Sequence, residues 1–307
     1  MNAPNLETVI GSIRLKNPVM TASGTFGYGS EYAGFVDLNA LGALVVKGIS
    51  ATPWNGNRTP RLVEVPGGLL NAIGLQNPGF DRFVASSMPF LRTLQTPVIV
   101  NIWGRTLEEY AAIAEKFDTV DGVAGLELNV SCPNIREGGI AFGTDLKLLG
   151  QVTAEARRRT SRTLIVKLSP NVTRIADFAR AAEANGADAV AVMNTFPAMA
   201  IDIETRRPRL SHGTGGLSGP AIHPIAVKLV YEAASAVAIP VIGMGGIQEA
   251  PDAIEFLIAG ARAVAIGTAN FTDPATALRV IDGLRAYLVR HGLPSLSDLV
   301  GTVRMGA

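Results

Sequence analysis

Short apolar segments recur along the whole chain, and each one closes on Gly, Ser, Asn or Lys. Within each segment the apolar residues are nearly continuous and do not alternate with polar ones. Such runs are typical of parallel strands that are buried on both faces. The sequence therefore predicts eight strands, at 18–23, 43–49, 97–103, 125–131, 163–169, 187–195, 240–245 and 262–268.

Helical patterns separate most of these strands. The expected helices cover 107–117, 145–159, 174–185, 222–237, 250–259 and 274–290. Eight alternating strand and helix units in roughly 250 residues predict a closed (β/α)8 TIM barrel. A doubly wound open sheet is the alternative.

A hairpin and three long connections complete the predicted organisation. Segments 6–10 and 13–15 flank Gly11 and Ser12, which predicts an N-terminal hairpin over about residues 6–16 that closes the N-terminal end of the barrel. The connections 51–80, 133–144 and 196–220 are too long for simple turns. Each follows a strand, so we expect lids at the C-terminal rim, where this fold holds its active site. No domain boundary is visible, and 1–307 is expected to form a single domain.

Composition narrows the possible functions. The 307 residues are 48% hydrophobic, which is enough apolar material for one large core. A formal net charge of +1 argues against a nucleic-acid surface, which usually needs a basic excess. The N-terminus lacks a signal-peptide pattern, and no apolar run approaches the roughly 20 residues of a membrane span. We therefore expect a cytoplasmic protein that does not associate with membranes.

The chain contains one cysteine, Cys132. This count excludes an internal disulfide. It also excludes an iron–sulfur cluster or a thiolate zinc site built from this chain alone, because those need about four ligands. The three histidines show no metal-ligand spacing, so no metal site is expected. Cys132 is either a packed small hydrophobe or a proton acceptor.

Glycine pairs follow the last two predicted strands, in Gly243-Met-Gly-Gly-Ile247 and Ile266-Gly-Thr-Ala269. In TIM barrels the loops after these strands commonly bind a phosphate group, since glycine lets backbone N–H groups approach the oxygens. Ser218 and Gly219 could contribute a third loop. The alternative is that glycine only permits tight turns. No Gly-x-Gly-x-x-Gly motif is present, so nothing supports NAD binding by this chain.

Polar residues end six of the predicted strands, and all six ends converge on one rim. Cations and amides gathered there are costly unless they meet a polar ligand, such as a flavin or an anionic substrate. Lys167 could favour a reduced, anionic flavin, or it could form a Schiff base in an aldolase-type barrel. The residues are Ser23, Lys47, Asn101, Asn129 with Cys132, Lys167, and Asn194 with Thr195.

Three segments carry a family resemblance. They are Asn-Pro-Val-Met-Thr-Ala-Ser-Gly-Thr-Phe-Gly at 17–27, Asn-Ala-Ile-Gly-Leu-Gln-Asn at 71–77, and Asn-Val-Ser-Cys-Pro-Asn at 129–134. With the glycine motifs, they resemble the class 1 dihydroorotate dehydrogenases, and most closely the catalytic subunit of the NAD-linked subclass, 1B. The resemblance covers nearly the whole chain, and its most specific motif is the one that contains the cysteine.

The resemblance implies that the chain oxidises dihydroorotate to orotate in pyrimidine biosynthesis, with FMN in the barrel mouth. Cys132 would be the base, a hydride would pass to flavin N5, and Lys167 would lie by the flavin's pyrimidine edge. FMN would be held by Ser23, Lys47, Gly48, Asn101, Asn129, Lys167, Met193, Gly219, Gly245, Gly246, Gly267 and Thr268. The substrate would be held by Lys47, Asn71, Ala72, Ile73, Gly74, Leu75, Asn129, Asn134, Asn194 and Thr195.

The predicted lid favours the NAD-linked subclass. Its segment 136–144, Arg-Glu-Gly-Gly-Ile-Ala-Phe-Gly-Thr, is similar to the NAD-linked pattern. The membrane class uses serine as its base, and dihydropyrimidine dehydrogenases usually have His after the Pro and carry iron–sulfur domains. Neither pattern matches this chain.

The resemblance also implies a partner. A second subunit would carry FAD and a [2Fe-2S] cluster and would reduce NAD. A homodimer of this chain would form a heterotetramer with two such subunits. The alternatives are a fumarate-dependent class 1A enzyme and a phosphate-binding barrel lyase that uses Lys167 as a Schiff-base amine.

Overall fold

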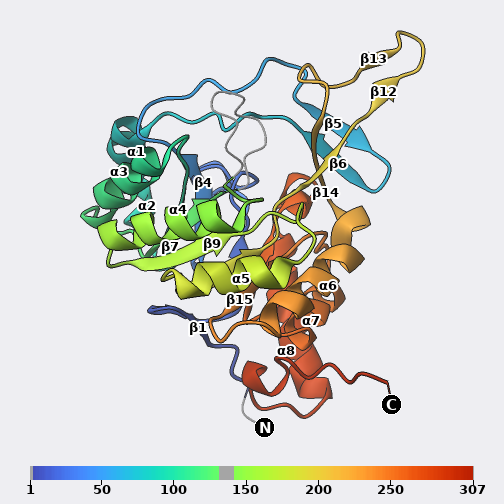
Figure 1. Ribbon diagram of the computed structural model, residues 1–307. Helices are drawn as coiled ribbons and strands as arrows, with labels where there is room; N and C mark the ends of the chain where they lie inside the picture. The colour runs from blue at the N-terminus through green and yellow to red at the C-terminus, as the bar shows by residue number, and fades with distance from the viewer. Residues whose placement is uncertain (1–2, 131–141, 307) are drawn as a thin grey trace.

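Eight parallel strands form the central sheet in the computed structural model, which describes residues 3–130 and 142–306 (Figure 1). The sheet order is β3-β16-β15-β10-β9-β8-β7-β4. All eight strands fall inside the apolar segments predicted from the sequence. Their bounds are β3 (Val19–Thr21), β4 (Leu44–Ile49), β7 (Val98–Ile102), β8 (Gly125–Asn129), β9 (Thr163–Lys167), β10 (Ala189–Val192), β15 (Val241–Met244) and β16 (Ala263–Ile266).

The first and last strands of this order meet and close the sheet. Met20 in β3 and Ala43, next to β4, form a parallel bridge. The hydroxyl of Thr21 donates to the carbonyl of Val45 at 3.1 Å and accepts from its N–H at 2.9 Å, so a side chain takes the place of a ladder bond. The predicted TIM barrel is confirmed, and the open doubly wound sheet is wrong.

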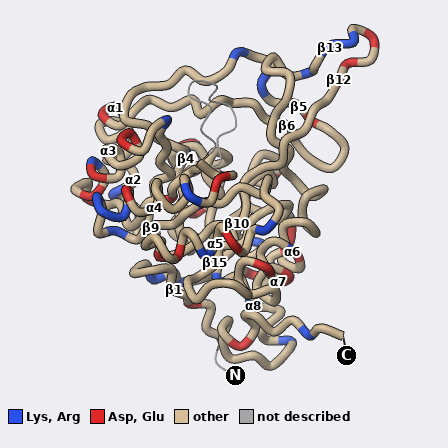
Figure 2. The backbone as a smooth tube through the Cα atoms, in the orientation of Figure 1, with Lys and Arg blue, Asp and Glu red and all other residues tan. Residues whose placement is uncertain are grey.

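The six predicted helices are present within three residues of their expected bounds. Side chains cap two of them, since Thr106 accepts from the N–H of Glu109 and Asp145 from that of Leu148. They are α3 (Leu107–Asp118), α4 (Leu146–Arg159), α5 (Ile175–Ala184), α6 (His223–Ala234), α7 (Ala250–Ile258) and α8 (Thr276–Arg290). Figure 2 shows acidic and basic residues interspersed over these helices.

Two short helices were not predicted. They are α1 (Phe80–Ser86) and α2 (Met88–Leu91), with seven and four residues. Neither is long enough to show an amphipathic repeat in the sequence. Between β3 and β4 the chain forms only the short 3-10 turn η1 (Leu38–Ala40), so the first barrel unit lacks an α-helix. No helix in the described ranges is long and apolar enough to cross a membrane.

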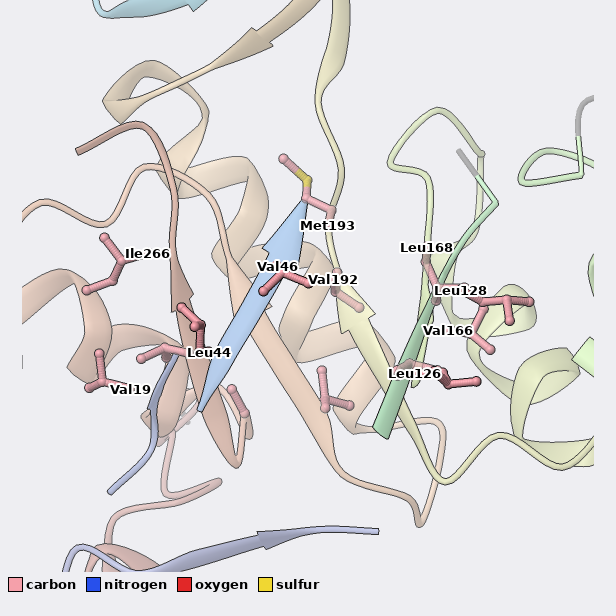
Figure 3. Close-up of a cluster of buried hydrophobic side chains, with 14 of the residues drawn as sticks. Val19, Leu44, Val46, Leu126, Leu128, Val166, Leu168, Val192, Met193 and Ile266 are labelled. Atoms are coloured by element: carbon pink, nitrogen blue, oxygen red, sulfur yellow. The ribbon is translucent and has the colours of Figure 1, made fainter. Parts of the chain in front are cut away.

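Side chains alternate between the inside of the barrel and the layer under the helices. In β4, Leu44 and Val46 belong to the cluster packed under the helices (Figure 3), while Val45 belongs to the inner cluster. The N-terminal hairpin of β1 (Thr8–Ile10) and β2 (Ile13–Leu15) adds Ile10, Ile13 and Leu15 to the inner cluster. The hairpin therefore closes one end of the barrel, as predicted.

A second, antiparallel sheet lies at the opposite end of the barrel (Figure 1). Its order is β11 (Phe196–Ala198), β14 (Gly215–Ser218), β6 (Gly68–Asn71) and β5 (Leu62–Val65), and the small hairpin β12 (Ile201–Asp202) and β13 (Arg207–Pro208) projects beyond it. The sequence analysis did not predict these strands. They come from the connections 51–80 and 196–220, whereas most of 133–144 lies outside the described residues.

Candidate active site

A cavity of about 800 Å³ opens where the barrel strands end. This volume falls in the range of cofactor and substrate pockets. The ends of β3, β4, β7, β8 and β9 form its floor, β6 and β14 form one wall, and the glycine loops after β15 and β16 form another. The cavity thus lies at the rim that the sequence predicted.

A buried ion pair joins the floor, where Lys167 lines the cavity, to Glu127, which does not line it. Lys167 Nζ lies 3.9 Å from Glu127 Oε1 and 3.3 Å from Ser23 Oγ. The side chains of Lys167 and Glu127 are only 7% and 3% exposed. Asn101 Nδ2 donates to Glu127 Oε1 at 2.6 Å. Burying a charge is costly unless it is paired, and here each charge has a partner.

Glu127 is a site residue that the sequence analysis missed. The signal was available, because Glu127 interrupts an apolar strand at a position that faces into the barrel between Leu126 and Leu128, which face the helices. A buried carboxylate in such a run indicates a specific partner. The register of β7 and β8 places Glu127 directly opposite Asn101.

An irregularity in β4 accounts for the position of Lys47. The pairing of β4 with β7 shifts register between Val46 and Ile49, and Lys47 with Gly48 occupies the shift and lines the cavity. Such bulges re-aim side chains at active sites. Burial of the ammonium group lowers the pKa of Lys47 below its ordinary value, and the cation of Arg61 lowers it further, while the carboxylate of Glu31 acts in the opposite direction.

Gly48 permits a close approach in the floor. A methyl group at this position would lie 2.6 Å from Asn101 Oδ1 and 3.3 Å from a ring carbon of Trp103. Both Gly48 and Asn101 line the cavity. Only glycine at 48 therefore lets Asn101 keep its place.

The predicted substrate residues gather on the other side of the cavity. Asn194 Nδ2 donates to Asn129 Oδ1 at 3.2 Å, and Asn71 Nδ2 donates to the carbonyl of Gly216 at 3.2 Å. Ala72 does not line the cavity. It is fully buried, and its N–H is bonded to the carbonyl of Arg61. The lining residues of this group are Lys47, Asn71, Ile73, Gly74, Leu75, Asn129, Asn194 and Thr195.

Three loops form the glycine wall. Gly219, Gly245 and Gly246 have φ angles of 108°, 135° and 73°, which side chains rarely adopt. A methyl group at Gly246 would lie 2.9 Å from the carbonyl oxygen of Gly219, so two loops touch. Thr268 joins them, because its hydroxyl donates to Ser218 Oγ at 2.9 Å. The predicted convergence of these loops is present, and Gly267 also lines the wall.

Cys132, Asn134 and most of the predicted lid lie outside the described residues. Asn129, three positions before the cysteine, lines the cavity. In residues 3–130 and 142–306, no group of His, Cys, Asp or Glu side chains is arranged to hold a metal ion. Met193, Ser23, Asn101 and Lys167 line the cavity as the sequence predicted.

Comparison with known proteins decides the family. Residues 5–288 match the family model of dihydroorotate dehydrogenase. The chain belongs to the dihydroorotate dehydrogenase family. The family prediction made from the sequence motifs is confirmed.

Relatives within the dihydroorotate dehydrogenase family match the whole chain. The "Dihydroorotate dehydrogenase B (NAD(+)), catalytic subunit" of Geotalea uraniireducens is 54% identical over 303 residues, or 99% of either chain. The proteins of the same name from Geotalea daltonii and Thermoanaerobacter pseudethanolicus are 53% identical over 305 residues and 52% identical over 301 residues. These matches cover 99% and 98% of this chain and 100% and 99% of the two relatives.

Proposed function

We propose that the protein oxidises dihydroorotate to orotate, with FMN as its cofactor and NAD as the final acceptor, in pyrimidine biosynthesis. The observation that carries this proposal is one cavity that joins a glycine wall, a cationic floor and an amide-rich side. The names of the full-length relatives support the same activity and acceptor.

The residues of the cavity fit FMN. The glycine wall offers backbone close to a bound group, which suits the phosphate end. The floor offers a lysine and two amides, which suit a polar ring edge. When bound, FMN would supply the hydride acceptor. The phosphate end would meet Gly219, Gly245, Gly246, Gly267 and Thr268, and the ring would meet Ser23, Lys47, Gly48, Asn101, Asn129, Lys167 and Met193.

The amide-rich side suits the substrate. Asn71, Asn129 and Asn194 each present a donor and an acceptor, which match the alternating N–H and carbonyl groups of a pyrimidine ring. Lys47 supplies a cation for the substrate carboxylate. With Gly74 and Thr195 nearby, these residues would orient the substrate and exclude water. Asn134 belongs to the same set by its motif.

We assign the base to Cys132 on its motif. A free thiol has a pKa of about 8.5, so a useful fraction is thiolate near neutral pH. Cys132→Ala should keep FMN and lose at least about 100-fold in turnover, the size expected for a positioned base. The measurement is steady-state oxidation of dihydroorotate. Near-normal turnover in this variant would remove the assignment.

The electrons must leave through another chain. This chain has one cysteine and no dinucleotide motif, so it carries neither a cluster nor an NAD site of the usual kind. A partner with FAD and a [2Fe-2S] cluster, in a heterotetramer built on a homodimer of this chain, is the arrangement we propose. The cytoplasmic location stays a prediction.

Two measurements test the proposed function. The purified protein should show visible flavin absorption that bleaches when dihydroorotate is added without oxygen. A colourless protein that borohydride traps with a sugar phosphate would instead support the lyase. The isolated chain should not reduce NAD until the iron–sulfur subunit is added, whereas efficient turnover with fumarate alone would favour class 1A.

A further inference from the structure

Glu127 lies beneath the cavity floor and contacts two residues that line it. Glu127 is 2% exposed and is absent from the cavity lining. Its carboxylate accepts from Asn101 Nδ2 at 2.6 Å and lies 3.9 Å from Lys167 Nζ. The carboxylate of Glu127 thus contacts both the amide of Asn101 in β7 and the ammonium group of Lys167 in β9.

The carboxylate determines which way Asn101 points. An ionised carboxylate only accepts hydrogen bonds, so the amide nitrogen of Asn101 must face Glu127. The amide oxygen then points toward Gly48, where an added methyl group would lie 2.6 Å from it. Because Gly48 and Asn101 both line the cavity, the floor presents an acceptor there.

The same carboxylate balances the charge of the floor. With Glu127 ionised, the pair it forms with Lys167 carries no net charge. Without it, a full positive charge would face the flavin. A cation beside a flavin stabilises its reduced, anionic form. The carboxylate of Glu127 offsets the charge of Lys167 and so weakens this stabilisation.

We propose that Glu127 is a positioning residue that orients Asn101 and Lys167 and lowers the reduction potential of the bound flavin. The inference rests on the proposed flavin function. It predicts that Glu127→Gln, which keeps the shape and an acceptor oxygen but removes the charge, raises the potential. We expect at least a tenfold shift toward reduced flavin, which is about 30 mV for a two-electron couple.

The experiment measures the midpoint potential of the FMN-loaded protein by equilibration with reference dyes. Glu127→Asp keeps the charge, so its equilibrium should stay within about threefold of the wild type. The matched control is Glu155→Gln, which removes the same charge from the surface ion pair with Arg158 on α4 and should change nothing. Thermal denaturation and FMN affinity, measured in parallel, report whether each variant is folded.

The outcomes separate a charge effect from a structural one. If Glu127 only holds Lys167 in place, Glu127→Gln should lower the potential, as removal of Lys167 would. The inference is overturned if Glu127→Gln leaves the reduction potential unchanged or lowers it. It is also overturned if Glu127→Asp shifts the potential as much as Glu127→Gln does. If the wild type binds no FMN, the proposed function fails. If it binds FMN normally and only the predicted shift is missing, the inference alone fails.

Discussion

Replacing Lys167 by Met should destabilise the protein even without a ligand. The substitution leaves the Glu127 carboxylate, whose side chain is 3% exposed, without the ammonium that lies 3.9 Å away. Coulomb's law gives about 4 kcal/mol for two unit charges at this separation and an effective dielectric near 20. Loss of one partner from a buried pair typically costs about 3–5 kcal/mol, which agrees.

The assay is urea denaturation of the apoprotein at neutral pH. Lys167→Met should lower the free energy of unfolding by about 3–5 kcal/mol. The double variant Lys167→Met, Glu127→Gln should recover most of this loss, because it removes the stranded charge and keeps an acceptor for Asn101.

A matched surface pair provides the control. Arg158 and Glu155 form an ion pair on α4 in which the arginine side chain is 61% exposed. Arg158→Met should change the free energy of unfolding by about 1 kcal/mol or less, as for other exposed pairs. A Lys167→Met variant as stable as the wild type would refute the reasoning, and so would a double variant no more stable than the single one.

Three further predictions concern the floor, the pH dependence and the core. Gly48→Val should weaken FMN binding at least tenfold in equilibrium dialysis, because its Cβ would lie 2.6 Å from Asn101 Oδ1; unchanged affinity would contradict this contact. Because the pKa of Lys47 is lowered, the ammonium group of the ligand-free protein loses its proton at a pH below the ordinary pKa of 10.5. The affinity for orotate should therefore be constant at pH values below the lowered pKa and should decrease above it. In Lys47→Arg this decrease should begin at a higher pH. Binding titrations with orotate at several pH values test both expectations. Phe117→Ala should cost about 3–5 kcal/mol in urea denaturation, because the ring is fully buried, and a loss below about 1 kcal/mol would argue against tight packing.

The predictions from sequence were most accurate where structure depends on neighbouring residues. Each barrel strand lies in a nearly continuous apolar run, and α3 is predicted to within one residue at its C-terminal end. The polar residues at the strand ends were found because strand ends converge once a barrel is assumed, whereas Met193 and the lining residues of the 71–75 segment were named from the family resemblance. Ala72 illustrates the limit: it belongs to a motif that lines the cavity, but its side chain packs away from it.

Long-range pairing could not be seen in the sequence. The second sheet joins β6 to β14, where Asn71 pairs with Gly216, 145 positions away, and no local pattern encodes such a partner. The register shift in β4 that places Lys47 is likewise a property of two strands. Both features shape the cavity wall or its floor.

The sequence by itself determined the barrel, the family and the chemical types of the cavity residues, because apolar periodicity and a specific motif are local properties of the chain. Only the tertiary structure decided how those residues are paired. Glu127 is an isolated acid in the sequence, and it becomes a counter-ion only because β7, β8 and β9 bring it opposite Asn101 and within 3.9 Å of Lys167. The free-energy cost of a buried charge depends on its distance from partners on neighbouring strands, and only the folded structure sets those distances.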